Sequence, residues 1–323
     1  MDPRQFTEQI NKAISHLQYG EHPPELYEPI RYIMALGGKR MRPLLTLMSY
    51  NLFKEDWEKA LKPALAVEVF HNFTLMHDDI MDNAPLRRGK KTVHEMWNNN
   101  IAILSGDVML VNAYELLLDV EDKHLRKVIR SFNLCAAEVC EGQQLDMNFE
   151  NKSIVTEEAY IDMIRLKTAV LLGFGLELGG IIAGASENNC HLLKSFGENM
   201  GIGFQLKDDL LDVFGDAEKF GKQVGGDILS NKKTFLLIKA LELSQNKEKE
   251  MLDYWLSLTN FDKEEKVKAI TEIYLKLDIK SLTEKKMNEY FDLAFQQLDT
   301  IQANKENKQL LSEFAKQIIN REK

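Results

Sequence analysis

Apolar residues recur every three or four positions along most of the chain, which is the spacing of an amphipathic helix. One such segment begins at Pro23-Pro24 and ends before Gly37. A second begins near Pro63 and continues to about Asp82. The same pattern predicts helices near 103–119, 122–148, 157–184 and 189–215, and amphipathic Lys/Glu-rich helices beyond about 242.

Signals for β-structure are scarce in this chain. Asn-Gly and Asp-Gly pairs, which mark tight hairpins, do not occur, and the 323 residues include only 18 glycines and 7 prolines. Hydrophobic residues make up 44% of the chain, enough for a sizeable core, and no Pro/Ser-rich linker interrupts it. We therefore expect an all-α fold, one large helical bundle formed by a single domain over residues 1–323.

Three segments between these helices lack the periodic pattern. Residues 37–43 (GGKRMRP) and 83–91 (NAPLRRGKK) are basic loops, and residues 214–234 form a longer loop rich in glycine and lysine. A loop of that length suggests a functional lid. After the second loop, Thr92 and Glu95 have the spacing of a helix capping box.

The segment 168–185 (TAVLLGFGLELGGIIAGA) has the composition of a membrane span. It is short for that role, carries the charged Glu177 and contains five glycines. We expect a buried helix, with no stable membrane insertion. Its glycines would allow a neighbouring backbone or a ligand to approach closely.

Charge and cysteine content narrow the class of protein. The chain has 50 acidic and 41 basic residues, and this net charge of −9 argues against binding to nucleic acid or to an anionic membrane. Three cysteines are too few for a disulfide framework, and the first ten residues lack the apolar core of a signal peptide. We expect a cytoplasmic protein.

The pattern D-D-x-x-D occurs twice, about 130 residues apart, each time within an apolar run: Asp78, Asp79 and Asp82, then Asp208, Asp209 and Asp212. Positions i and i+4 share a helix face, so the outer carboxylates of each triplet point the same way. Like charges on a core-facing stripe are costly to desolvate, and divalent cations would remove that cost. Oxygen-only ligands favour Mg²⁺, which completes its shell with water and substrate phosphate.

A polyphosphate held by such metal ions also needs cationic side chains. Basic residues stand beside both acidic triplets despite the negative net charge: Lys39, Arg40, Arg42, Arg87, Arg88, Lys90, Lys91, Lys222, Lys232 and Lys233. Guanidinium groups bind phosphate oxygens in pairs of hydrogen bonds. Lys167 and Thr168 begin the apolar segment and could stabilise charge beside an apolar chain; by themselves they are more typical of a lysine that reaches from a helix end to water.

The two acidic triplets, GGKRMRP, the Arg87-Arg88-Gly89 run and Lys167-Thr168 occur in an order that resembles the trans-prenyl diphosphate synthases over roughly residues 30–240. The resemblance implies a helical bundle around a deep cavity, a homodimer, and three Mg²⁺ ions. It also implies head-to-tail condensation of isopentenyl diphosphate with an allylic diphosphate of C5 to C15.

The resemblance also assigns roles to individual residues. It makes Asp78, Asp82 and Asp208 the direct metal ligands, and Asp79, Asp209 and Asp212 ligands either directly or through water. It places isopentenyl diphosphate on Lys39, Arg42, His71 and Arg88, and the allylic diphosphate on Arg87, Lys167, Lys222 and Lys232. Thr168 and Gln205 would lie near the reacting carbons.

Product length should depend on the helix that carries Asp78. Phe73 lies five positions before Asp78, beside Thr74, and Phe70 lies about one turn deeper. In the family, a bulky residue at that position is typical of short-chain enzymes. The chain lacks the two-residue insertion in the first triplet that is common in bacterial farnesyl diphosphate synthases, so a C20 geranylgeranyl product is favoured over C15 farnesyl.

Other classes of protein remain open at this point. A terpene cyclase or a head-to-head coupling enzyme also uses acidic motifs, but would not need the second diphosphate site. A partner subunit of a heteromeric synthase would be expected to lose aspartates that this chain keeps. A di-iron bundle could use the Glu-x-x-His pairs at Glu68–His71 and Glu121–His124.

Overall fold

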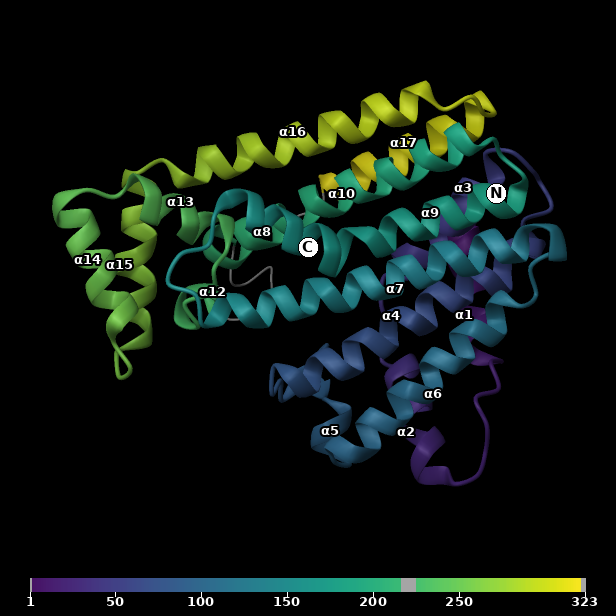
Figure 1. The fold of residues 1–323 in the computed structure, drawn as a ribbon, viewed down its shortest axis with the longest axis horizontal. Helices are drawn as coiled ribbons and strands as arrows, with labels where there is room; N and C mark the ends of the chain where they lie inside the picture. The colour runs from purple at the N-terminus through teal and green to yellow at the C-terminus, as the bar shows by residue number, and fades with distance from the viewer. Residues whose placement is uncertain (1, 216–224, 321–323) are drawn as a thin grey trace. The chain divides into compact units, whose positions relative to one another are not determined.

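The computed structural model describes residues 2–215 and 225–320, which are helical almost throughout (Figure 1). The first elements are α1 (Pro3–Ser15), α2 (Pro24–Ala35), α3 (Met41–Asn51), the 3₁₀ turn η1 (Trp57–Ala60), α4 (Leu61–Met81), β1 (Leu86–Arg87), β2 (Lys90–Lys91), α5 (Val93–Met96) and α6 (Asn99–Leu117). Next come α7 (Asp122–Glu150), α8 (Glu157–Ile164), the π-helical turn η2 (Arg165–Ala169), α9 (Val170–Ala183) and α10 (Glu187–Phe214). The chain continues with α12 (Gly226–Leu229), α13 (Phe235–Leu243), α14 (Asn246–Ser257), α15 (Lys263–Lys276), α16 (Ile279–Thr300) and α17 (Lys305–Ile319). The predicted all-α class is confirmed.

The predicted helices are present, and their ends differ from the prediction by up to about four residues. Helix α2 has proline in its first turn, where no backbone donor is needed, and Gly37 follows it in the left-handed region at φ 78°. The single helix expected over 157–184 is instead α8 and α9 joined by the π-helical turn η2, where a backbone bond spans five residues instead of four. Periodicity of side chains does not report such a local change of pitch.

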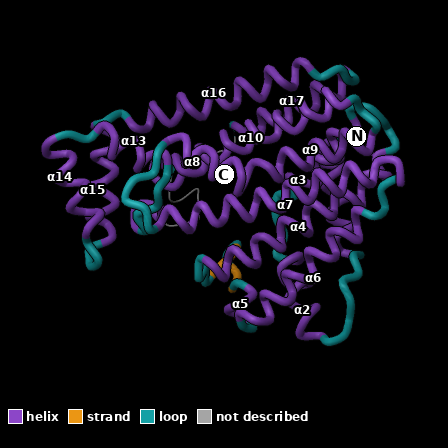
Figure 2. The backbone as a smooth tube through the Cα atoms, viewed as in Figure 1, coloured by secondary structure: helices purple, strands orange, loops and turns teal. Residues whose placement is uncertain are grey.

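The basic loop after α4 contains a small hairpin that the sequence did not predict. Strands β1 and β2 pair antiparallel, orange in Figure 2, and Arg88 and Gly89 form the turn with φ 53° and 73°. Two successive residues at positive φ are typical of a type I′ turn, here made by Arg-Gly in place of Asn-Gly. The capping-box prediction is wrong, because the Thr92 hydroxyl donates to the Ala84 carbonyl rather than capping α5.

The chain divides into two compact units. Unit 1 comprises Met1–Ala136, Leu171–Gly197 and Leu298–Ala315, and unit 2 comprises Ala137–Val170, Glu198–Gln297 and Lys316–Lys323. In unit 1, α4 packs against α3 and α6 (Figure 1). A Cβ at Gly179 would overlap Ser49 and the Thr46 carbonyl, so the glycines of α9 allow close approach to α3, as predicted for a neighbouring backbone.

Unit 2 contains two apolar clusters. One lies around Leu236, Leu237, Ile270 and Tyr274, and joins the end of α10 to α12–α16. The other lies around Phe149, Tyr160, Leu206 and Phe235, and joins α7, α8, α10 and α13. The polar C-terminal third of the sequence supplies five of the eleven buried residues of the first cluster: Leu252, Ile270, Ile273, Tyr274 and Ile279.

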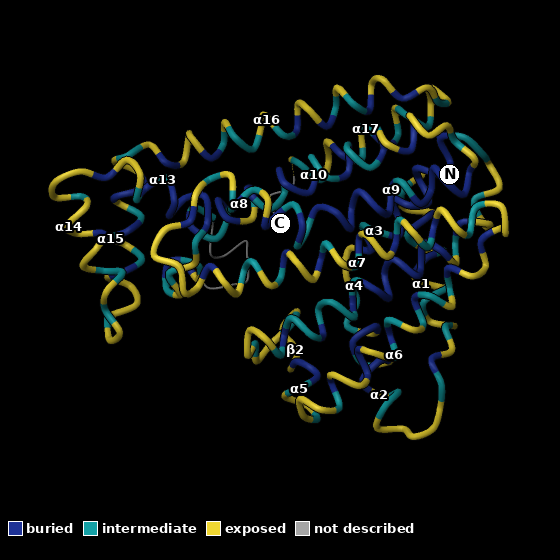
Figure 3. The backbone as a smooth tube through the Cα atoms, viewed as in Figure 1, coloured by how far each residue is buried: buried dark blue, intermediate teal, exposed yellow. Residues whose placement is uncertain are grey.

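Two stretches of the described chain are long and apolar enough to cross a membrane, Asn99–Leu117 and Glu157–Ala183. In the second, 83% of the most apolar window is buried, and α9 is dark blue along its length in Figure 3. This confirms the buried helix predicted for the apolar segment. In α6 only 33% of the window is buried.

Candidate active site

The first acidic triplet lies at the C-terminal end of α4 in unit 1. Asp79 is only 2% exposed, and its two carboxylate oxygens each accept a 2.9 Å hydrogen bond from Arg87 Nε. Burial raises the pKa of Asp79, and Arg87 opposes that rise. Asp78 is half-buried, with its Oδ2 3.8 Å from the Arg87 guanidinium, and Asp82 is exposed at the helix end.

The second triplet repeats this arrangement at the end of α10 in unit 2. Asp209 is 3% exposed, accepts a hydrogen bond from the Tyr160 hydroxyl on Oδ2, and accepts one of 3.2 Å from Gln205 Nε2 on Oδ1. Burial raises the pKa of Asp209 to about 7, although the Tyr160 and Gln205 bonds oppose the rise. Asp208 is exposed and Asp212 is half-buried.

In both triplets, then, the protein itself binds the middle carboxylate, while the outer carboxylates are more accessible. A hard cation that keeps several waters and binds one or two carboxylates fits the outer donors. Among residues 2–215 and 225–320, no three His, Cys, Asp or Glu side chains form a complete metal site by themselves. The donor set fits Mg²⁺ shared with a substrate diphosphate, whose oxygens would supply further ligands.

A basic cluster in unit 1 lies around Arg42. Its Nη1 is 3.1 Å from His71 Nε2, and its buried Nε has no hydrogen-bond partner within the described chain. Burial lowers the pKa of His71 well below its usual value, and the neighbouring arginines lower it further. His71 is therefore neutral, and its Nε2 accepts from Arg42.

The double glycine before α3 makes room for Arg88. The Arg88 guanidinium donates to the Gly37 carbonyl, and a Cβ at Gly38 would lie 2.9 Å from Arg88 Nη2. Within the part of the chain that the structure describes, no carboxylate pairs with Arg42 or Arg88. Two guanidinium groups held without counter-ions are typical of an anion site.

Arg40 has a different position from its neighbours in the GGKRMRP segment. It is buried, its Nη1 lies 2.5 Å from Glu68 Oε1, and its Nη2 donates to the Met34 carbonyl. Glu68 thus acts as the counter-ion of an arginine and His71 accepts from another, so this Glu-x-x-His pair does not form half of a di-iron centre.

Lys167 lies in the π-helical turn η2 of unit 2, and its Nζ is 2.6 Å from Asp146 Oδ2. A Cβ at Gly142 would overlap the backbone nitrogen of Lys167, so the glycine lets α7 lie directly against this turn. One residue on, the Thr168 hydroxyl donates to Gln205 Oε1 at 3.4 Å. Thr168 is therefore linked to Asp209 through Gln205, which the spacing of these residues in sequence did not reveal.

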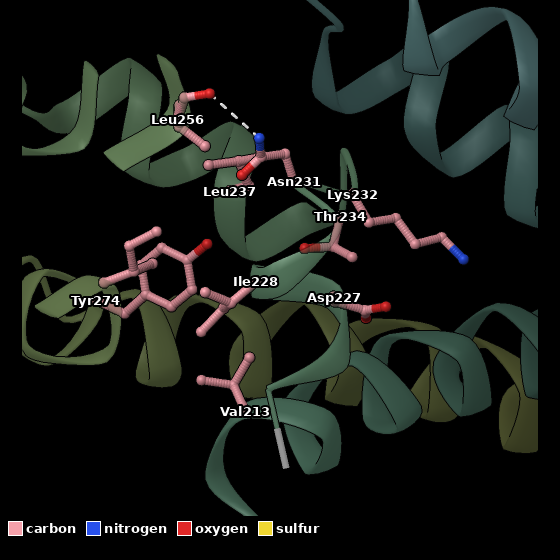
Figure 4. Close-up of a pocket in the computed structure, with 10 residues that line it drawn as sticks. Val213, Asp227, Ile228, Asn231, Lys232, Thr234, Leu237, Leu256 and Tyr274 are labelled. Carbon is pink, nitrogen blue, oxygen red and sulfur yellow. Dashed lines mark hydrogen bonds between the residues drawn. The ribbon is translucent and has the colours of Figure 1, made fainter. Parts of the chain in front are cut away.

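The segment after α10 brings further polar groups to the second triplet. The Asp227 N–H donates to Asp212 Oδ2 at 2.9 Å, and the side chains of Asp227 and Lys232 extend in the same direction in Figure 4. Burial raises the pKa of Asp227 to about 6, and Lys232 opposes the rise. Lys222 lies outside the described residues, as does much of the predicted lid.

Sequence reasoning missed Asp146 and Asp227. Each is a single carboxylate outside the repeated triplets, with no periodic or spacing signal to distinguish it from a solvated side chain. Only the fold places Asp146 against Lys167 and Asp227 against Asp212.

The residues expected to control product length lie together in unit 1. Phe73 is half-buried, with its ring centroid 5.5 Å from that of Phe70 and 4.8 Å from that of His77. Phe70 is fully buried and meets Phe132 edge to face. The Thr74 hydroxyl donates to the His71 carbonyl.

The fold and these two groups of side chains define a helical protein with two carboxylate triplets and a cluster of arginines. Residues 23–274 match the family model described as polyprenyl synthetase, and the chain belongs to that family.

Named relatives agree with this assignment. The chain is 42% identical over 257 residues to a short chain isoprenyl diphosphate synthase of Methanocaldococcus jannaschii, covering 79% of this chain and 78% of that protein. It is 40% identical over 303 residues to a geranylgeranyl diphosphate synthase of Saccharolobus solfataricus, covering 92% and 91%. A crystal structure of a geranylgeranyl pyrophosphate synthase has a TM-score of 0.92 at 42% identity, covering 98% of this chain and 97% of that one.

Proposed function

We propose that this protein condenses isopentenyl diphosphate head to tail with an allylic diphosphate of C5 to C15, in the trans configuration, and depends on Mg²⁺. One observation carries the proposal: each acidic triplet keeps its outer carboxylates more accessible than its middle one, while a separate cluster holds two arginines with no carboxylate partner among the described residues. Two diphosphate substrates with different roles need two sites, the carboxylate triplets for one and the arginine cluster for the other. A terpene cyclase, which binds a single diphosphate, would need only the carboxylate triplets.

The isopentenyl diphosphate site is assigned to unit 1. Arg42 and Arg88 grip the diphosphate, Lys39 adds a third cation, and neutral His71 orients Arg42. No carboxylate partner has to be displaced from either arginine among the described residues, so this substrate binds without a metal ion.

The allylic diphosphate is assigned to the carboxylate triplets and to the cations beside them. Asp78, Asp82, Asp208 and Asp212 would hold the Mg²⁺ ions, three by our proposal, while Asp79 and Asp209 hold the triplets in place through Arg87 and Tyr160. The remaining cations are Arg87, Lys167, Lys232 and Lys222. We propose that residues 1–323 act as a single catalytic domain.

The chemistry follows from the charges. When bound, Mg²⁺ neutralises the leaving diphosphate. The chain's arginines and lysines bind the same oxygens as the allylic carbon–oxygen bond breaks, which leaves an allylic carbocation and free diphosphate. The double bond of isopentenyl diphosphate attacks the cation, a carbon–carbon bond forms, and a proton passes to the released diphosphate. Thr168 and Gln205 provide fixed oxygen dipoles near the cation.

We propose a C20 product, with C15 as the second choice. The half-buried ring of Phe73 against Phe70 supports a short chain, since it fills space five positions before Asp78 on the same helix. The relatives named as geranylgeranyl diphosphate synthases support C20.

We further propose a cytoplasmic homodimer that binds no nucleic acid. Helix α6 supports the dimer, because Ile103, Leu104 and Val111 are 42%, 57% and 65% exposed on it. Among the described residues, Cys135, Cys140 and Cys190 form no disulfide with one another, which supports a reducing compartment.

The test is elongation by purified protein with isopentenyl diphosphate, Mg²⁺ and C5, C10 or C15 primers. We expect a discrete C20 product that disappears with a chelator and falls at least about 100-fold in Asp78→Ala. Asp253→Ala, an exposed aspartate on α14, is the matched control. A cyclic hydrocarbon, or no elongation by folded protein, would refute the proposal.

A further inference from the structure

Lys266 of α15 is an unusual side chain for its surroundings. It is 0% exposed, and within residues 2–215 and 225–320 no carboxylate pairs with it. Its ammonium lies 4.1 Å from the ring centroid of Phe261 and donates a 2.7 Å hydrogen bond to Asn231 Oδ1. Burying an ammonium without an anion is costly, so an apolar residue would be expected here unless the cation has a task.

Lys266 donates to Asn231, whose left-handed backbone turns the chain after α12. Asn231 has φ 55°, in the left-handed region, and its other amide atom, Nδ2, donates 3.2 Å to the Leu256 carbonyl at the end of α14 (Figure 4). Both ends of the amide are thus fixed, one by α15 and one by α14. The next residue along the chain is Lys232.

Further contacts hold the same segment on α15. A Cβ at Gly225 would lie 2.7 Å from Val267, and Ile228 packs in the cluster with Ile270 and Tyr274. On its other side the segment reaches the second triplet, through Gly225 N–H to the Asp212 carbonyl at 2.6 Å and Asp227 N–H to Asp212 Oδ2. Residues 225–232 therefore lie between α15 and Asp212.

We propose that Lys266 is a positioning residue, which acts through the Asn231 amide to fix Lys232 and the Asp212 carboxylate for the allylic diphosphate. This inference rests on the proposed function. It assigns a role to the C-terminal helices that no sequence motif indicated, because Lys266 on α15 would act on Lys232 only through Asn231.

The variants to compare are Lys266→Met, which keeps the length of the side chain, and Asn231→Gly, which keeps the left-handed backbone. Lys268→Met, exposed on the same helix, is the control. We expect each of the first two to raise KM for the allylic diphosphate about tenfold, as for loss of one charge-assisted hydrogen bond, with KM for isopentenyl diphosphate within about twofold of wild type.

A double variant tests the route of the effect. If Lys266 acts through Asn231, the two changes together should raise the allylic KM no more than the larger single change. Unchanged allylic KM in folded Asn231→Gly, or an equal loss for both substrates, would overturn the proposal even if Lys266→Met does not fold.

A binding measurement separates this inference from the proposed function. Calorimetry with inorganic diphosphate, with and without Mg²⁺, should show the Mg²⁺-dependent binding weakened about tenfold in both variants and unchanged in Lys268→Met. If wild-type protein fails to elongate any primer, the proposed function fails, and this measurement still decides the role of Lys266: unweakened binding would refute it.

Discussion

At the scale of single residues, the two acidic triplets are alike in sequence but not uniform within themselves. The protein binds the middle aspartate of each, Asp79 through Arg87 and Asp209 through Tyr160 and Gln205. A buried carboxylate with protein donors is fixed in place, and it fixes the helix turn that carries its neighbours. The middle residues thus orient the outer ones.

The ionised carboxylate of Asp209 should lower the stability of the metal-free protein at high pH. Its pKa is about 7 in the folded chain against 3.8 in the unfolded chain, so the unfolded chain loses its proton first and stability falls as pH rises from about 4 to 7. Asp209→Asn removes the buried charge. We expect its metal-free melting temperature at pH 8 to exceed that of wild type by about 2 °C or more, while elongation falls.

Melting curves at pH 8 and pH 5, in the presence of a chelator, test this. The gap between Asp209→Asn and wild type should shrink at pH 5, where the wild-type carboxyl is protonated in the folded state. A variant that melts below wild type at pH 8 would show that the hydrogen bonds to Asp209 outweigh the cost of its charge.

Phe73 should limit product length. Replacing it by alanine removes a ring that packs on Phe70, and the vacated volume should admit one or more further five-carbon units. Chromatography of the dephosphorylated products would show Phe73→Ala shifted beyond the wild-type length. Phe53→Ala, another half-buried phenylalanine, should leave length unchanged; an unshifted Phe73→Ala product would remove Phe73 from this role.

At the scale of elements, the distinctive feature is the π-helical turn η2 between α8 and α9. The extra residue in the turn places Lys167 against α7, where Asp146 binds it and Gly142 leaves room for its backbone. Local departures of this kind often occur at functional sites. Here the π-helical turn η2 places Lys167 directly before the buried helix α9.

Gly142→Ala should disrupt this contact, because the added Cβ would overlap the backbone of Lys167. Overpacking of this kind costs about 1–3 kcal/mol of unfolding free energy. We expect kcat to fall in variant protein that is still folded, since the Lys167–Asp146 pair must shift. Urea unfolding and turnover are the measurements, with Glu141→Ala, on the exposed face next to it, as control. Unaltered turnover and stability would mean that α7 has room to move.

At the scale of the whole molecule, the two compact units divide the chemistry. Unit 1 carries the first triplet and the arginine cluster, and unit 2 carries the second triplet with Lys167 and Lys232. Neither unit has both sets of groups, so the proposed reaction belongs to the whole chain.

The exposed face of α6 should mediate self-association. Val111→Asp adds a third acidic side chain between the exposed Asp107 and Glu115 and should convert a dimer to monomers at micromolar concentration, because a charge buried in the interface is left unpaired. Light scattering during size-exclusion chromatography measures the mass. Ile154→Asp, in an exposed loop, is the control; a wild-type monomer, or a Val111→Asp dimer, would refute α6 as the interface.

The sequence by itself determined the helices, the order of the motifs and the family. Helical periodicity and the spacing of Asp78 and Asp82 are properties of neighbouring residues, so they can be read without a fold. The sequence also indicated correctly that the segment 168–185 is buried, because a charge and five glycines are poor features for a membrane span.

Only the tertiary structure decided which side chains are held in place and which residues hold them. Arg40 resembles Arg42 in sequence, yet the fold pairs Arg40 with Glu68 and leaves Arg42 without a carboxylate among the described residues. The contact of Asp146 with Lys167 and that of Lys266 with Asn231 join residues more than twenty positions apart. Their strength comes from burial and from the absence of competing water, and neither is a property of local sequence.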